Sequence, residues 1–162
     1  MSVNHAQTLP PRPGARPRTT PTNPHTQLEQ QPEDPGLRER LAQRVFALPG
    51  VEERPSQISV PGARALWLRD DVPAGPPEAF MIGREFAHLH PRPDMSAHAS
   101  LPPGVAEAAI AAGWAELHPV ARMGIIPPTT VMLYAPRDDD ELEVIFRLML
   151  ESYRFAGGSA QG

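Results

Sequence analysis

Histidine is the residue type in this chain whose spacing most directly indicates chemistry. Four of the six histidines lie close together in the sequence: His88, His90, His98 and His118. Side chains two residues apart in an extended segment share a face, so His88 and His90 should point the same way. If the chain reverses near Pro93, His88 lies opposite His98, and three imidazoles meet on one face of a hairpin.

Residues beside these histidines extend the same pattern. Phe86 continues the first row at a spacing of two, and Ser96 and Ser100 flank His98 at the same spacing. An arginine guanidinium donates paired hydrogen bonds to anionic or enolate oxygens, so nearby arginines are of interest. The charged candidates for contacting a substrate are Glu85, Arg84 and Arg92, with Arg137 farther along the chain.

Three interpretations of the histidines stay open from the residues alone. They could pair with backbone groups or carboxylates on a partly exposed sheet. A His-x-His pair with a third histidine also resembles a metal site, as in a cupin-like enzyme. Alternatively, an imidazole with an ordinary pKa of about 6.5 could take a proton from an acidic substrate without a metal. The predicted helices, and the lack of a glutamate after His90, argue against a cupin, whose barrel is all β.

Composition excludes several kinds of chemistry. The chain has no cysteine, which rules out disulfides, thiolate metal sites and cysteine nucleophiles. All 15 basic residues are arginine, so Schiff-base chemistry is ruled out as well. A net charge of −4 does not favour nucleic-acid binding. The chain shows neither a membrane-spanning run of apolar residues nor the apolar centre of a signal peptide, so we expect no membrane partner and a cytoplasmic location.

Composition also predicts the domain boundaries. Residues 1–35 hold 8 of the 22 prolines and none of the aromatic residues. A segment that buries so little apolar area does not offset its ordering entropy, so we expect a disordered, proline-rich tail. We expect one folded domain over residues 36–157 and a flexible C-terminus over 158–162. The tail's proline motifs could also bind a proline-recognising module.

The pattern of apolar residues predicts an α+β fold with a largely antiparallel sheet of about five or six strands and helices packed on it. A capping box, Asp138 with Glu141, marks the start of the last helix. Gly113 marks the end of a small alanine-rich helix. The expected order is α-β-β-β-β-β-α-β-α. The expected segments are a helix from residue 35, two strands within 57–68, strands at 79–82, 86–90 and 96–101, a helix at 105–112, a central strand at 129–134 and a helix from 138.

Four blocks of sequence resemble a known family. They are GREFAHLHP at 83–91, DMSAHASLPP at 94–103, AGWAELHP at 112–119, and 134–155, which runs from YAPRDDDELEVIFRL to SYRF. The blocks are similar to the luciferase domain of the fungal bioluminescence enzyme, a family with many small bacterial members. Their order and spacing are more specific than any one motif. Met95 and the run 120–123 depart from the family's pattern, which bears on the shape of a pocket.

The resemblance implies an activity and a role for the histidines. The fungal enzyme adds O₂ to a hydroxylated pyrone, and the family implies no required metal or organic cofactor. Such chemistry needs a base and an oxyanion donor, and the family's histidine positions match His88, His90, His98 and His118 here. We expect binding or oxygenation of an enolic or phenolic small molecule without a cofactor, and no emission of light. A non-catalytic binding or structural domain and a metal-dependent enzyme are the alternatives. The oligomeric state is left open.

Overall fold

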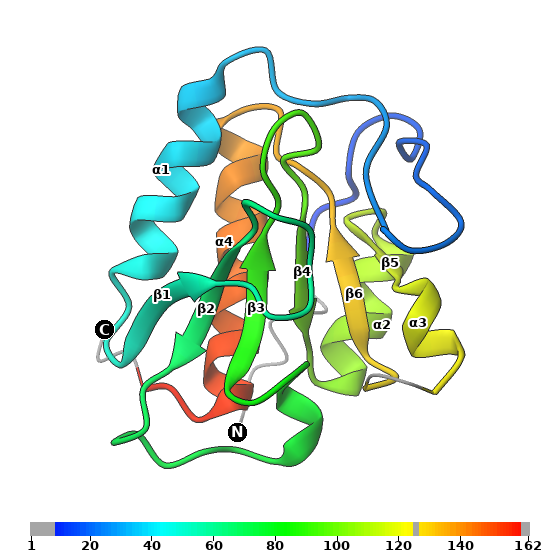
Figure 1. The fold of residues 1–162 in the computed structure, drawn as a ribbon. Helices are drawn as coiled ribbons and strands as arrows, with labels where there is room; N and C mark the ends of the chain where they lie inside the picture. Colours follow the sequence, from blue (N-terminus) through cyan, green and yellow to red (C-terminus); the bar gives the residue numbers. More distant parts are fainter. Residues whose placement is uncertain (1–8, 125–126, 160–162) are drawn as a thin grey trace.

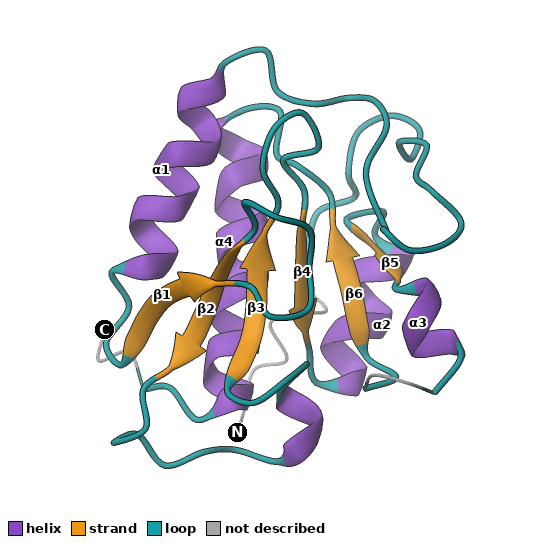
Figure 2. Ribbon diagram, in the orientation of Figure 1, coloured by secondary structure: helices purple, strands orange, loops and turns teal. Residues whose placement is uncertain are grey.

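The computed structural model of the chain describes residues 9–124 and 127–159. Figures 1 and 2 show the helices and strands in these ranges. In chain order they are α1 Pro35–Phe46, β1 Val51–Pro55, β2 Arg64–Leu68, the short 3₁₀ helix η2 Pro77–Ala79, β3 Glu85–Leu89, β4 Ala97–Ser100, α2 Pro103–Ala111, β5 Ala115–Leu117, α3 Pro119–Arg122, β6 Thr130–Leu133 and α4 Asp139–Ala156. No helix in the described ranges is long and apolar enough to cross a membrane.

Six strands form one sheet in the order β1-β2-β3-β4-β6-β5, and every neighbouring pair is antiparallel. This confirms the predicted α+β fold, and β6 lies inside the sheet as predicted. The strand expected at 79–82 is instead η2 and a turn, because the chain reverses at Gly83 (φ 54°) and Ile82 pairs with Glu85. The additional strand β5 has only three residues and none of them is β-branched, so the sequence signals it weakly.

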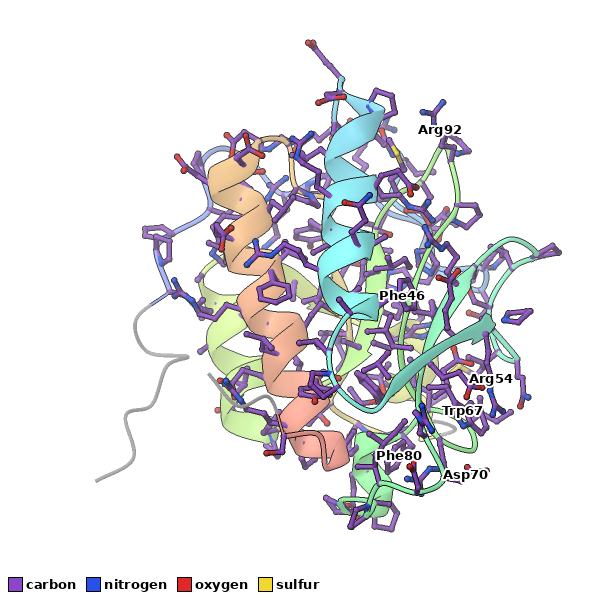
Figure 3. All side chains as sticks on the ribbon, turned by 90° about the vertical axis from the view of Figure 1, so that its left-hand side faces the viewer. Phe46, Arg54, Trp67, Asp70, Phe80 and Arg92 are labelled. Atoms are coloured by element: carbon purple, nitrogen blue, oxygen red, sulfur yellow. The ribbon has the colours of Figure 1, made fainter. Side chains whose placement is uncertain are left out.

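Helices α1 and α4 lie side by side on one face of the sheet, as the side view in Figure 3 shows. The side chain of Asp138 accepts a hydrogen bond from Glu141 N at 2.8 Å and so caps α4, as predicted. The buried positions of α4 recur every three or four residues, which packs one stripe of the helix on the sheet. They include Leu142, Ile145, Met149 and Tyr153. This layer of helix and sheet forms the hydrophobic core.

The central strands send alternate side chains to opposite faces of the sheet. Ala87 and Ala99, which pair across β3 and β4, belong to the core beneath the helices. His88 and His98 are the next pair in this register, and their side chains lie on the opposite face. The predicted juxtaposition of these two histidines is therefore confirmed. In front of this second face, the loop between β1 and β2 crosses β3 and β4 (Figure 1).

Residues 9–34 run along the domain and contact it through hydrogen bonds. Pro10 O accepts one from Trp114 Nε1 at 2.7 Å, and the side chain of Gln27 accepts one from Ala135 N at 2.9 Å. The domain boundary at residue 36 stays a prediction. Within residues 9–34 of the expected tail, polar side chains make these contacts with the domain. Residues 1–8 lie outside the described residues, as do residues 160–162 of the expected flexible C-terminus.

Candidate functional site

A cavity of about 370 Å³ opens on the face of the sheet opposite α1 and α4. This volume is typical of a site for a small organic molecule. Five histidines line one wall: His25, His88, His90, His98 and His118. The remaining wall comes from the N-terminal segment at 23–26, from the β1–β2 loop at 58–60 and from Met81. The cavity thus combines an apolar lining with a concentrated set of imidazoles.

Three of the imidazoles form a continuous row between two carboxylates. His88 Nε2 lies 3.1 Å from His98 Nδ1, and His98 Nε2 lies 2.9 Å from His25 Nδ1. At one end Glu85 Oε2 is 2.8 Å from His88 Nδ1, and at the other Glu116 Oε2 is 2.7 Å from His25 Nε2. The row joins β3, β4, β5 and the N-terminal segment.

The other two histidines flank this row. The ring centroid of His90 lies 4.5 Å from that of His98, and the ring centroid of His118 also lies 4.5 Å from it. His90 Nδ1 is 2.9 Å from Ser96 Oγ and 3.0 Å from Asp94 Oδ2. Ser96 Oγ in turn donates a hydrogen bond to Asp94 Oδ1. The hydroxyl proton is therefore used, and His90 must donate its own Nδ1–H to Ser96.

Neutral donors surround the two carboxylates at the ends of the row. Glu85 accepts hydrogen bonds from Ser56 Oγ at 2.7 Å and from Gln57 N at 3.1 Å. Glu116 accepts them from Thr19 Oγ1 at 2.7 Å and from Tyr134 Oη at 2.8 Å. Burial raises the pKa of Glu116. Its hydrogen bonds, including the one from His25, lower the pKa by more, so the net shift is downward and the carboxylate stays ionised.

Burial keeps three of the imidazoles, those of His88, His98 and His118, neutral. It lowers the pKa of His88 and lowers that of His98 to well below its ordinary value of 6.5. Burial and the neighbouring histidines lower the pKa of His118 to about 4. At neutral pH each of these three rings therefore carries one proton and one lone pair, and can bind a proton or a cation.

A bulge in the pairing of β2 with β3 changes one predicted neighbour. The register shifts between Leu66 and Trp67, so that Trp67 pairs with Glu85 rather than with Phe86. Phe86 consequently packs toward the helices, where its ring contacts that of Tyr153 in α4. The expectation that Phe86 shares the face of His88 is wrong. Glu85 takes that place beside His88.

The predicted arginines lie away from the cavity lining. Arg84 donates hydrogen bonds to Leu68 O and Arg69 O, both at 2.8 Å, and so fixes the loop after β2. Arg92 lies in the turn between β3 and β4, at the opposite end of the molecule from Asp70 (Figure 3). Arg137 pairs with Glu141 at the start of α4. The structure therefore gives Arg84 and Arg137 structural contacts, and of the charged candidates it brings only Glu85 to the histidines.

Sequence reasoning missed two residues of the row, His25 and Glu116. His25 lies in a proline-rich stretch that contains no strand or helix, and Glu116 lies in a strand of three residues. Neither position has a periodic pattern that would link it to the other histidines. The one available signal was that two of the six histidines, His25 among them, lie in the N-terminal stretch outside the predicted strands.

The chain is thus a small α+β domain that buries a histidine cluster on one face of an antiparallel sheet. Residues 83–152 match the family model described as the luciferase domain, which confirms the resemblance found in the sequence. These residues contain β3, β4, β6 and most of α4, together with four of the five clustered histidines. The remaining histidine, His25, lies outside the matched range.

Curated relatives agree with this family. The chain is 31% identical over 153 residues to proteins named luciferase from Armillaria ostoyae and Armillaria gallica, an alignment that covers 85% of this chain and 57% of each relative. It is 30% identical over 92 residues to the luciferase of Neonothopanus nambi, covering 51% of this chain and 34% of that protein. The chain therefore spans little more than half the length of the Armillaria relatives. No solved structure matches it.

Proposed function

We propose that the chain binds an enolic or phenolic small molecule in the histidine-lined cavity and promotes its reaction with O₂. The observation that carries this proposal is the cavity wall of buried imidazoles, three of which, His88, His98 and His118, have lowered pKa values. An acidic hydroxyl placed against such a wall meets lone pairs that accept a hydrogen bond, and the apolar side contributed by Ile58, Val60 and Met81 suits a planar ring. The relatives named luciferase support the same class of reaction.

His118 is our candidate for the base. His118 flanks the row, with its ring centroid 4.5 Å from that of His98, and it lines the cavity. Its lowered pKa of about 4 leaves the ring neutral at neutral pH. When a substrate hydroxyl transfers its proton to this ring, the resulting enolate is the electron-rich species that reacts with O₂. The neighbouring row of imidazoles and the polar donors around it stabilise the charge.

His90 is the second candidate for a group that contacts the substrate oxygen. Its Nδ1–H is held by Ser96, which orients the ring and leaves Nε2 with a lone pair. The two residues come from different elements, since His90 follows β3 and His118 follows β5. A planar substrate between them would be held from two sides. The proposal invokes no organic cofactor.

A panel of 3-hydroxy-2-pyrones and catechols tests the proposal. Binding is followed by quenching of tryptophan fluorescence, and turnover by O₂ uptake in an oxygen electrode. We expect saturable binding and O₂ consumption above the rate without protein. We expect His118→Ala to lower the rate of O₂ uptake 100-fold or more, in line with the loss of a general base. Glu107→Ala, at an exposed position of α2, is the matched control and should leave both measurements unchanged.

Two outcomes separate the alternatives. Saturable binding without O₂ uptake by any compound would indicate a binding module and would contradict the oxygenation step. No binding by any member of the panel would contradict the assignment of the ligand class. In both cases circular dichroism must first show that the variants are folded.

A further inference from the structure

We propose that His88, His90 and His98 form a binding site for one divalent transition-metal ion. The site would lie on the wall of the cavity, between β3, the residue that follows it and β4. The inference goes beyond the proposed function, and it depends on the described side chains and not on any substrate. Four observations carry it: convergence of ring nitrogens, acceptors that hold the outer nitrogens of two rings, the close approach of His88 to His98, and the carboxylates around the cluster.

The ring nitrogens converge to the spacing that a metal ion requires. One ring nitrogen from each of His88, His90 and His98 lies within 4.8 Å of the others, and all three residues are buried. The closest pair, His88 Nε2 and His98 Nδ1, is 3.1 Å apart. Bonds of about 2.0–2.1 Å from zinc to imidazole nitrogen place neighbouring ligands about 3–3.5 Å apart. Small rotations of the side chains would complete the site.

The ring nitrogens of His88 and His90 that would not bind the ion, Nδ1 in both residues, are held as in protein metal centres. Glu85 accepts from His88 Nδ1–H at 2.8 Å, while Ser96 and Asp94 hold Nδ1–H of His90. A metal-binding histidine typically donates its second N–H to a carboxylate or another acceptor, which fixes the tautomer and the orientation of the ring. Here both contacts leave the Nε2 lone pairs of His88 and His90 directed away from the carboxylates.

His98 lies between two ring nitrogens. His88 Nε2 is 3.1 Å from His98 Nδ1, and His25 Nδ1 is 2.9 Å from His98 Nε2. A cation bound between His88 Nε2 and His98 Nδ1 would contact both nitrogens, and His98 would keep its contact with His25.

Buried negative charge around the cluster also calls for a cation. Glu85 and Asp94 are buried, Glu116 is partly exposed, and the three residues together carry three formal negative charges. Within the described part of the chain, the ion pairs of these carboxylates are with His88, His90 and His25 and with no arginine. Asp94 Oδ2 is buried, and its contact among the described residues is His90 Nδ1 at 3.0 Å. Burying carboxylates without a counter-charge is costly, and a divalent cation would offset that cost.

The donor set selects the class of metal. Three imidazole nitrogens favour Zn²⁺, Fe²⁺ or Co²⁺ over Mg²⁺ and Ca²⁺, which prefer oxygen ligands. Three protein ligands leave further coordination positions open toward the cavity, as in catalytic rather than structural metal sites. A hydroxyl or enolate oxygen could occupy one of them. His118, the proposed base, is outside this set of ligands.

A second group, His25, His98 and His118, also brings one ring nitrogen of each residue within 4.8 Å of the others. It shares His98 with the proposed site. We assign the metal to His88, His90 and His98 because acceptors fix the tautomers of two of these three rings and because two of the three lie on paired strands. Single substitutions in each group distinguish the two assignments.

Metal titration of the full, untagged chain after dialysis against a chelator tests the proposal. Co²⁺ is added while its visible absorption is recorded, and Zn²⁺ is then used to displace it. We expect one equivalent of Co²⁺ to bind, with absorption bands of nitrogen-ligated Co²⁺ that Zn²⁺ abolishes. His90→Ala should weaken binding 100-fold or more, and Asp94→Asn about 10–100-fold because it acts through His90. His118→Ala and Glu107→Ala should change the affinity less than threefold.

Three results would overturn the assignment. Folded protein that binds neither ion stoichiometrically would show that the three histidines do not form a metal site. A larger loss in His118→Ala than in His90→Ala would move the ion to the second group. An unchanged affinity in a folded His90→Ala or His90→Gln variant would remove His90 from the site. Because no organic ligand is used, failure here leaves the proposed function to be judged by its own assay.

Discussion

Replacing His25 with alanine tests whether the N-terminal segment is an integral part of the site. The side chain of His25 is completely buried and connects His98, at 2.9 Å, to Glu116, at 2.7 Å. His25→Ala leaves His98 Nε2 without this partner in a buried position, which costs about 1–3 kcal/mol. Glu116 loses less, because its side chain is 24% exposed and keeps two other donors. We expect the free energy of unfolding to fall by about 2 kcal/mol.

The measurement is urea unfolding of the full chain without metal, followed by tryptophan fluorescence. For an m-value of about 2 kcal/mol/M, the expected loss lowers the midpoint by about 1 M urea. Thr22→Ala is the matched control, since Thr22 lies in the same segment with an exposed side chain, and it should change stability by less than about 0.5 kcal/mol. Equal midpoints for the two variants would refute the reasoning and show that His25 does not anchor the segment.

Three further predictions concern the boundary, a turn and acid stability. Removing residues 1–35 should preserve the far-ultraviolet circular dichroism, because the buried core lies within residues 37–156, and loss of that spectrum would disprove the boundary. Gly75→Ala should lower the urea midpoint strongly, because the new Cβ would lie 2.1 Å from Phe155 O, and an unchanged midpoint would contradict this packing. Burial raises the pKa of Glu141, but hydrogen bonds from Arg137 lower it overall. The stabilisation from this pair is therefore present above the ordinary pKa of 4.5 and is lost as the pH falls below it, so Glu141→Gln should flatten stability measured from pH 6 to 3.

Local patterns in the sequence were enough to predict much of the fold. The caps and apolar spacing of α1 and α4 are properties of consecutive residues, because a helix closes its hydrogen bonds within a few positions. The pairing of His88 with His98 could be predicted for the same reason, since a short turn determines the register of a hairpin. Where a local irregularity intervened, as in the bulge beside Trp67, the same alternation misplaced Phe86.

Contacts between distant residues were decided by the tertiary structure. His25 and His98 are 73 positions apart, and His25 and Glu116 are 91 apart, so no local rule connects them. Composition shows only that the N-terminal segment has little apolar area to bury. In the structure, His25 and Gln27 of this segment are buried and make hydrogen bonds. A buried polar side chain needs a partner in three dimensions, and sequence spacing does not reveal which one. The sequence by itself thus determined α1, α2, α4, the central hairpin and three of its histidines, and only the folded sheet determined which carboxylates and which third imidazole complete the row.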